Sequence, residues 1–179
     1  DRPITISAAG SRKATRWPAQ TLLWSELANR LQVPVRGTET LAEYLGWKKG
    51  RQEDGSEERG VGKEGRSRWP PYPCRMASRD VITLDLDNIP SGGTEDVLRR
   101  IAGLGCGYCI YSTRKHEPAK PRFRVLAPLA RTCTADEYEP IARRLAARLR
   151  LDLRDPSTLK ASRLRYSPSC CSASPYIYA

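Results

Sequence analysis

A regular alternation of β-type and helical runs between residues 79 and 169 constrains the fold of this chain more than any other feature. The runs that predict strands are short and rich in β-branched or apolar residues, and they cover residues 80–87, 106–113, 122–127 and 162–166. One predicted helix begins at Thr94 with an acidic first turn, and another begins at the capping box Thr134-Ala-Asp-Glu137. The resulting order, β-α-β-β-α-β, predicts an α+β fold of the ferredoxin or RRM-like type, in which two helices cover one face of an antiparallel sheet.

The rest of the chain predicts a helical module and a loop. Apolar residues at helical spacing predict helices over residues 19–31 and 38–45, the first ended by Val33-Pro34 and the second capped by Thr38. Residues 48–73 are basic, rich in glycine and poor in apolar side chains, so they cannot offset their ordering entropy, and we expect a flexible loop. We expect one domain over residues 1–179, made of an N-terminal helical module (1–47), this loop (48–73) and a core (79–169).

The charge of the chain points to a polyanionic partner. Lys and Arg number 31 against 20 acids, which gives a formal net charge of +11. Phosphate contacts of nucleic acids release counterions, so such an excess favours them. No apolar run approaches the ~20 residues that span a bilayer, and residues 1–17 lack the apolar stretch of a signal peptide, so we expect no membrane and a cytoplasmic location.

Histidine and cysteine usage excludes or weakens several metal sites. His116 is the only histidine, which excludes sites that need a histidine pair. Cys106 and Cys109 have C-x-x-C spacing, but residues three apart on a strand face opposite ways, and no second such pair follows. We expect buried or incidental thiols there.

Asp85 and Asp87, on the first predicted strand, are the candidates for metal chemistry. Residues two apart on a strand point to the same face, so the two carboxylates lie together while Leu84 and Leu86 face the core. Two like charges so close are unfavourable unless a cation neutralises them. Mg²⁺ is commonly held by one or two carboxylates, with waters and substrate phosphates completing its coordination. A strand end with two solvated acids has the same pattern, so the pair alone leaves both interpretations open.

Cationic and hydroxyl side chains gather after the second and within the third predicted strand. If the first and second predicted strands are neighbours, these side chains lie at the same edge of the sheet as Asp87. Arginine suits phosphate because its planar guanidinium makes bidentate hydrogen bonds. The predicted phosphate clamp consists of Ser112, Thr113, Arg114, Lys115 and His116. Arg122 and Arg124 extend it, since they alternate onto one face of the third strand while Phe123 and Val125 are on the other. A third carboxylate, needed for a two-metal site, would come from Asp155 or Asp152.

The combination of these motifs resembles a known family. Asp85-Leu-Asp87, Tyr111-Ser-Thr-Arg-Lys-His116, Asp155-Pro-Ser-Thr and Ser162-Arg-Leu-Arg-Tyr-Ser-Pro168-Ser are similar to the three motifs of archaeo-eukaryotic primases. The likeness is greatest to the primase-polymerase domains of phages and mobile elements that often precede a virulence-associated protein E type helicase. One departure is the spacing of Ser112 and His116, since the wider superfamily often has Ser-x-His in its second motif.

The resemblance implies a primase fold and a DNA primase or primase-polymerase activity. Such an enzyme uses nucleoside triphosphates, a single-stranded DNA template and a primer, with two Mg²⁺ or Mn²⁺ ions, and a helicase domain would belong to the full-length protein or element. Asp85, Asp87 and Asp155 would be the metal ligands, with Asp152 the alternative to Asp155. Ser112 and His116 would hold the nucleotide phosphates, and Arg163 would lie near the nucleotide or the primer terminus.

Two other functions fit the same pattern of residues. A metal-dependent nuclease shares the acidic triad and its basic surroundings, although it has no need of a triphosphate clamp. A non-catalytic RNA- or DNA-binding module can share the fold, although such modules usually place aromatics on the sheet face.

Overall fold

A computed structural model describes residues 1–8, 16–44, 78–151, 156–161 and 167–179 and shows a mixed α+β protein. Its elements in chain order are β1 (Pro3–Ser7), β2 (Ala19–Leu23), α1 (Trp24–Gln32), β3 (Val35–Arg36), β4 (Ser78–Leu86), α3 (Thr94–Ala102), β5 (Cys109–Ser112), β6 (Phe123–Thr134), α4 (Ala135–Arg148), the 3-10 helix η1 (Pro156–Leu159) and β7 (Ser169–Cys170). Residues 41–44 are also helical.

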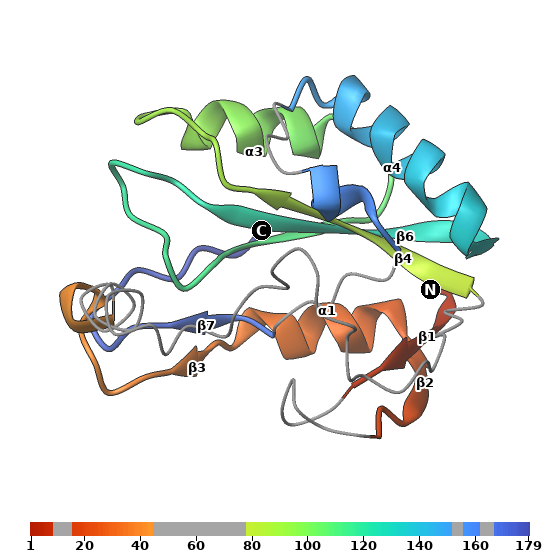
Figure 1. Ribbon diagram of the computed structural model, residues 1–179, viewed down its shortest axis with the longest axis horizontal. Helices are drawn as coiled ribbons and strands as arrows, with labels where there is room; N and C mark the ends of the chain where they lie inside the picture. The colour runs from red at the N-terminus through yellow and green to blue at the C-terminus, as the bar shows by residue number, and fades with distance from the viewer. Residues whose placement is uncertain (9–15, 45–77, 152–155, 162–166) are drawn as a thin grey trace, which may run out of the picture.

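The central sheet has three antiparallel strands in the order β4-β6-β5 (Figure 1). Leu86 of β4 lies opposite Phe123 of β6, and Ser112 of β5 lies opposite the same residue from the other side. The first strand of the core therefore pairs with the third, and the third with the second, which agrees with the β-α-β-β-α part of the predicted arrangement. The fourth strand that we predicted, residues 162–166, lies outside the described residues.

The end of the chain adds to the sheet along the outer edge of β5. Ile110 N–H donates to the Ala179 carbonyl at 2.8 Å, and Ser112 N–H donates to the Ile177 carbonyl at 2.9 Å. Tyr178 and Tyr111 form an antiparallel bridge between these bonds. The edge of β5 is thus paired with backbone from the last residues of the chain, a contact that nothing in our sequence analysis predicted.

Helices α3 and α4 cover one face of the sheet, as predicted (Figure 1). The capping box of α4 forms, because Glu137 N–H donates to Thr134 Oγ1 and Thr134 N–H donates to a Glu137 carboxylate oxygen. The helices and the sheet bury a continuous apolar core that includes Leu84, Leu86, Val97, Ile101, Ile110, Phe123, Val125, Tyr138 and Ala142.

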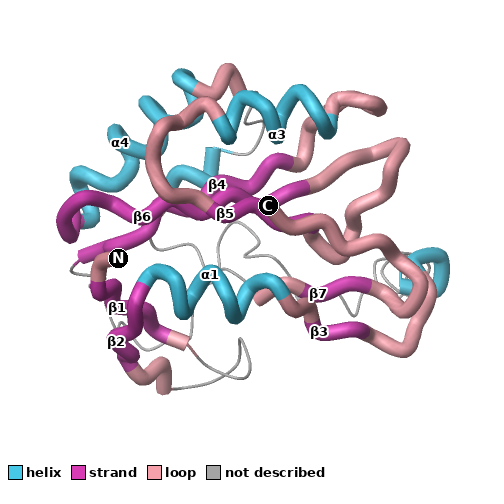
Figure 2. The backbone as a smooth tube through the Cα atoms, turned by 180° about the vertical axis from the view of Figure 1, so that it is seen from behind, coloured by secondary structure: helices cyan, strands magenta, loops and turns pink. Residues whose placement is uncertain are grey.

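The opposite face of the sheet is covered by α1 and the β1-β2 hairpin (Figure 2). Leu27 and Leu31 of α1 pack with Ile4 and Leu22 of the hairpin against the sheet. Cys109, Tyr111 and Leu126 are the buried sheet residues that belong to this apolar cluster. The sheet therefore lies between two apolar layers, and polar side chains that the α1 layer covers are sheltered from bulk water.

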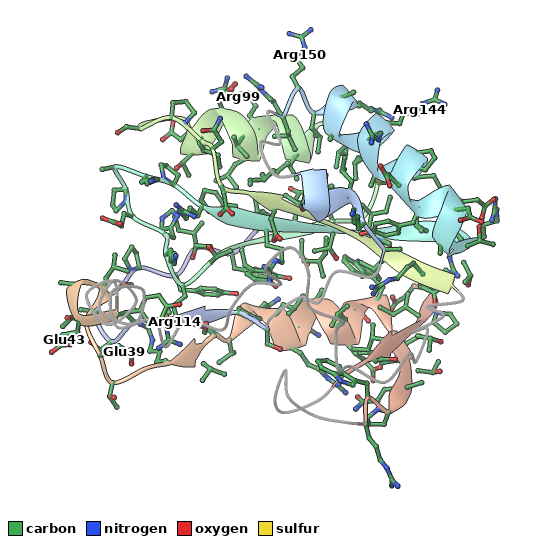
Figure 3. The ribbon with its side chains drawn as sticks, viewed as in Figure 1. Glu39, Glu43, Arg99, Arg114, Arg144 and Arg150 are labelled. Carbon is green, nitrogen blue, oxygen red and sulfur yellow. The ribbon has the colours of Figure 1, made fainter. Side chains whose placement is uncertain are left out.

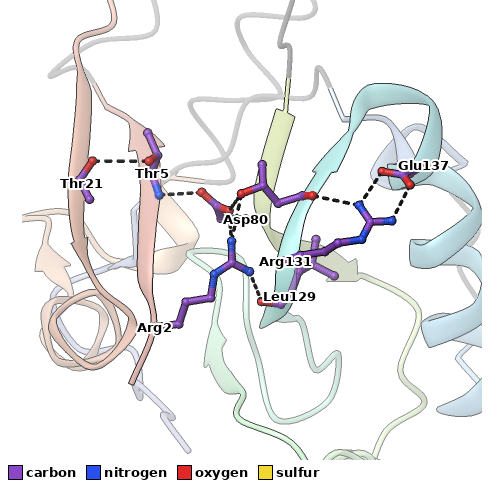
Figure 4. Close-up of polar contacts among 8 residues, drawn as sticks. Arg2, Thr5, Thr21, Asp80, Leu129, Arg131 and Glu137 are labelled. Atoms are coloured by element: carbon purple, nitrogen blue, oxygen red, sulfur yellow. Dashed lines mark hydrogen bonds and ion pairs between the residues drawn. The ribbon is translucent and has the colours of Figure 1, made fainter.

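Asp80 joins the hairpin to the sheet through a buried polar network (Figure 4). Its carboxylate forms an ion pair with Arg2 at 2.6 Å and accepts hydrogen bonds from Thr5 N–H at 2.8 Å and Thr132 Oγ1 at 2.5 Å. Arg2 also donates to the Leu129 carbonyl at 2.5 Å. A buried carboxylate needs such partners to offset its desolvation, so Asp80 is a structural acid and not a further site residue.

The predicted helical module at the N-terminus is wrong in part. Residues 19–31 do not form one helix, because Ala19–Leu23 pairs with Pro3–Ser7 as a strand. The helix begins only at Trp24, where the Glu26 carboxylate accepts a hydrogen bond from Leu23 N–H at 2.8 Å and fixes the first turn. The helix does end at Val33, as predicted.

The cap of the next helical segment is Thr40, not the predicted Thr38. Thr40 N–H donates to the Glu43 carboxylate at 2.7 Å, and Glu43 N–H donates to Thr40 Oγ1 at 3.3 Å. Thr38 has Leu41 three residues later, and leucine cannot close such a box. The loop predicted for residues 48–73 lies outside the described residues.

Candidate functional site

Asp85 and Asp87 project from β4 and its end on the face turned away from α3 and α4. Leu84 and Leu86, which alternate with them, are 0% and 2% exposed in the core beneath those helices. Asp85 lies directly opposite Arg124 in the β4-β6 register. The alternation that we predicted for both strands is confirmed, and it places the acids of β4 beside the arginines of β6.

Asp85 forms a close and largely buried ion pair with Arg124. The Arg124 Nε donates to Asp85 Oδ1 at 2.5 Å, and the two side chains are 12% and 10% exposed. The Arg124 guanidinium also lies 6.0 Å from the centre of the Tyr111 ring. Burial alone would lower the pKa of Arg124, but Tyr111 and Asp85 outweigh burial and raise that pKa. Arg124 therefore stays a cation against Asp85.

Asp87 forms a second, more open pair with Arg122. The Arg122 Nη1 and Asp87 Oδ1 atoms are 3.2 Å apart, and the side chains are 21% and 52% exposed. Solvent screens such a pair, so it contributes little to stability. The two pairs form a charge-balanced row that is tight at Asp85 and loose at Asp87.

The third predicted motif meets this row through Thr158 of η1. Its hydroxyl oxygen accepts a hydrogen bond from Asp85 N–H at 2.9 Å, and Thr158 is 1% exposed. Thr158 follows Asp155 by three residues. Asp155, Asp152 and Arg163 lie outside the described residues. Thr158, in the part of the third motif that the structure describes, thus contacts Asp85, the first of the predicted metal ligands.

The last residue of β5, Ser112, and the first residue of the following loop, Thr113, hold this part of the chain to neighbouring segments. Ser112 is buried, and its hydroxyl accepts a hydrogen bond from Ile177 N–H at 3.0 Å. Thr113 N–H donates to the Arg122 carbonyl at 3.1 Å, and its own carbonyl accepts from His116 N–H at 2.8 Å. The Ser112 hydroxyl therefore anchors the end of the chain, and the half-buried Thr113 closes a tight turn.

His116 is buried at the end of this turn. Its Nδ1 accepts a hydrogen bond from Arg122 N–H at 3.2 Å, and its ring centre lies 4.9 Å from that of Phe123. Burial lowers the pKa of His116 below its ordinary value. With Nδ1 accepting, the proton of the neutral ring is on Nε2. His116 thus offers one ring N–H donor. Its ring is also held by the N–H of Arg122, the residue whose side chain pairs with Asp87.

Arg114, one of the cations of the loop, has its ion-pair partner in the N-terminal part of the chain. Arg114 forms an ion pair with Glu39 and lies 4.9 Å from the centre of the Tyr44 ring. Figure 3 shows Arg114 and Glu39 together, near β3. Lys115 is half-buried. The structure therefore brings Asp85, Asp87, Arg122, Arg124 and His116 together, and it turns Arg114 toward the N-terminal part of the chain.

The described cysteines show no metal site. Cys106 is exposed, whereas Cys109 is buried and its burial raises its pKa to about 12. The described residues hold no group of three or more His, Cys, Asp or Glu side chains arranged for a metal ion. Asp155 and Asp152, the candidates for the third carboxylate, lie outside the described residues, so this statement does not cover them.

Two contacts of the site escaped the sequence analysis. Thr158 supports Asp85 through its backbone, and Tyr111 lies beneath Arg124. Both residues belong to the quoted motifs, but neither was given a role. Tyr111 was detectable in principle, since it occupies the same sheet face as the arginines, whereas the contact of Thr158 depends on a fold-back that spacing does not reveal.

These features define a mixed α+β domain with a row of paired acids and arginines on the face of its sheet beneath α1. The family model of the VapE N-terminal domain matches residues 1–179, and the chain belongs to this family. The comparisons with curated proteins and with solved structures gave no match. Within the described residues, every helix is too short or too polar to cross a membrane.

Proposed function

We propose that this chain is the catalytic domain of a DNA primase or primase-polymerase with an archaeo-eukaryotic primase fold. The observation that carries the proposal is the convergence of three separate motifs at one end of β4. Asp85 and Asp87 belong to the first, the turn ending at His116 contacts Arg122 beside them, and Thr158 of the third bonds to Asp85 N–H. Membership of the VapE N-terminal domain family supports the setting of a phage or mobile element, in a bacterial host cytoplasm and with a helicase domain in the full-length protein or element.

The acids of the row suit Mg²⁺ or Mn²⁺. Asp85 and Asp87 would hold the ions, with Asp155 as third ligand and Asp152 as its alternative. Each described acid is already paired with an arginine, Arg124 in one case and Arg122 in the other, so a bound ion would take the place of that arginine at the carboxylate. When bound, two such ions would lower the pKa of an attacking 3′-hydroxyl and offset charge on the phosphoryl group in transfer.

The chain's own cations would bind the triphosphate. Arg122 and Arg124 would exchange their carboxylate partners for phosphate oxygens, for which their planar forks are suited. The Nε2–H of His116 would donate to a third oxygen, and Thr113 and Lys115 would line the approach. Ser112 would act through the loop, because its hydroxyl holds Ile177. Arg163 would face the nucleotide or the primer terminus.

A non-catalytic nucleic-acid-binding module is the second candidate, and the ion pairs favour it. Each acid is already neutralised by an arginine, so the row is stable without a metal ion. Such a module would bind an oligonucleotide equally well with and without divalent ions.

The proposal is tested by primer extension and de novo priming on single-stranded DNA with Mg²⁺ or Mn²⁺. Wild type is compared with the variant Asp85→Asn/Asp87→Asn and with Asp136→Asn, which changes an exposed acid in the first turn of α4. We expect metal-dependent incorporation that only the double variant loses. Loss of nucleotides from the labelled primer would identify a nuclease, and metal-independent DNA binding without product would support the binding module.

A further inference from the structure

The C-terminal ends of α3 and α4 meet on the outer side of the helical layer. Arg100 Nη1 donates to the Arg150 carbonyl at 3.1 Å, and Arg148 Nη2 donates to the Leu104 carbonyl at 3.4 Å. These bonds fix the two helix ends against each other. Five arginines lie in the last turns of these two helices or directly after them, and we name them the arginine junction: Arg99, Arg100, Arg144, Arg148 and Arg150.

The arginine junction carries more positive charge than its acids neutralise. Arg99 and Arg100 share a single partner, Asp96, whereas Arg144, Arg148 and Arg150 form no ion pair with any residue that the structure describes. All five side chains are exposed. Figure 3 shows Arg99, Arg144 and Arg150 pointing outward, on the side of the helices away from the sheet. Some positive charge at helix C-termini suits the helix dipole, but one or two cations are enough for that.

Arg150 occupies a backbone position that favours glycine. It has φ 50, in the left-handed region. Arg150 N–H donates to the Ala147 carbonyl and Leu151 N–H to the Ala146 carbonyl, both at 3.0 Å, which is the Schellman ending of α4. The residue at this place is usually glycine, because a Cβ is strained there. The chain thus has a strained arginine, directed into solvent, where glycine would be easier.

We propose that the arginine junction binds the sugar-phosphate backbone of nucleic acid. Arg144, Arg148 and Arg150 supply guanidinium groups with no ion pair among the described residues, and such groups match phosphate oxygens and carry no base readout. The surface lies behind the helices, on the opposite face of the sheet from Asp85 and Arg124. It is therefore a second contact, used by a strand or duplex that continues past the row of paired acids.

The test is a binding titration of the whole chain with labelled single-stranded and duplex DNA, in EDTA and over a range of salt. Without divalent ions or nucleotides, its result is independent of nucleotidyl transfer, which could fail while this binding succeeds. Each lost phosphate contact reduces the salt slope by about 0.7 for single strands or 0.9 for duplex, which corresponds to roughly fivefold or more in affinity at ~0.1 M salt. We expect this loss for Arg144→Gln and again for Arg150→Gln.

Two further variants separate charge from folding. Arg150→Gly relieves the backbone, so we expect a melting temperature higher by roughly 2–4 °C together with roughly fivefold weaker binding. Arg131→Gln is the matched control, since it also removes one cation, but from a pair with Glu137 at the other end of α4. The length of α4 separates the Arg131–Glu137 pair from Arg150 by about 20 Å, which is well beyond the Debye length. Equal loss in the control, or a more stable Arg150→Gly with unchanged affinity, would overturn the proposal, as would binding to anionic phosphatidylserine vesicles but not to DNA.

Discussion

Replacing Arg124 by glutamine tests whether Asp85 is a metal ligand or half of a structural ion pair. In the structure the Arg124 Nε donates to Asp85 Oδ1 at 2.5 Å, so a metal ion that binds Asp85 must displace the guanidinium. Glutamine keeps much of the side-chain volume and removes the charge. The variant should therefore lose stability and bind Mn²⁺ more tightly than wild type.

The size of both effects follows from the burial of the pair. With the two side chains 12% and 10% exposed, Asp85 without Arg124 is a poorly solvated charge. Breaking a buried pair costs about 3–5 kcal/mol, and the lower end suits a site at the end of a strand. For a chain of this length, about 3 kcal/mol lowers the melting temperature by roughly 6–12 °C. In the wild-type chain the Mn²⁺ ion must break the interaction of Asp85 with Arg124. If that interaction is worth about 1.4 kcal/mol, its removal raises the affinity for Mn²⁺ about tenfold.

The assay is a calorimetric Mn²⁺ titration of wild type, Arg124→Gln and Arg122→Gln, with thermal unfolding of each. Arg122→Gln is the graded control, because its pair with the half-exposed Asp87 should be worth less than about 1 kcal/mol. Adding Asp85→Asn to Arg124→Gln should abolish the gain in affinity. If Arg124→Gln is destabilised as expected but binds Mn²⁺ no better than wild type, Asp85 is not a ligand and the reasoning fails.

Three further predictions concern stability and are checked by urea unfolding. Burial holds the pKa of His116 below its ordinary 6.5, so the contribution of the neutral ring to the free energy of unfolding is full above about pH 6.5 and is lost as the pH falls through the lowered value, by at most about 1.4 kcal/mol per pH unit. His116→Asn should remove this pH dependence of stability, and an unchanged slope would refute the prediction. Thr158→Val leaves the Asp85 N–H without its acceptor and should cost about 1–3 kcal/mol, whereas Thr158→Ser should cost clearly less; equal losses would show that packing alone matters. Asp80→Ala breaks the pair with Arg2 and should cost about 3 kcal/mol, and a loss below about 1 kcal/mol would contradict the structural role of Asp80.

The core was predictable because its signals are local. Alternation of period two fixed the faces of residues 80–87 and 122–127, and the Thr134–Glu137 capping box fixed the start of α4. The N-terminal part was less predictable. Residues 19–23 have leucines compatible with a helix, and only pairing with β1, which residues 8–18 separate from β2 along the chain, makes them a strand. Partners distant in the chain override local periodicity.

The candidate site was predictable as a set of residues but not as a set of contacts. Asp85, Asp87, Arg122 and Arg124 were expected on strand faces at one edge of the sheet, and the structure brings them together. The hydroxyl of Ser112, in contrast, was expected at a phosphate and is bonded to Ile177 N–H. That bond depends on the last residues of the chain returning to the edge of β5. Tyr176-Ile-Tyr178 has the residue types of a strand, but the run is too short to predict a strand or its partner.

The arginine pairs follow from the same alternation that placed the acids, and they change how the site would work. Once β4 and β6 are adjacent and in register, Asp85 must face Arg124, so residues assigned separately to metal and to phosphate neutralise each other. A nucleotide arriving with its metal ions would bring both partners of the exchange, cations for the carboxylates and phosphates for the guanidiniums. Metal ions alone would have to leave the largely buried Arg124 unpaired, which is costly. Binding of metal and nucleotide should therefore be strongly coupled in the wild-type chain, and much less so once Arg124 is replaced.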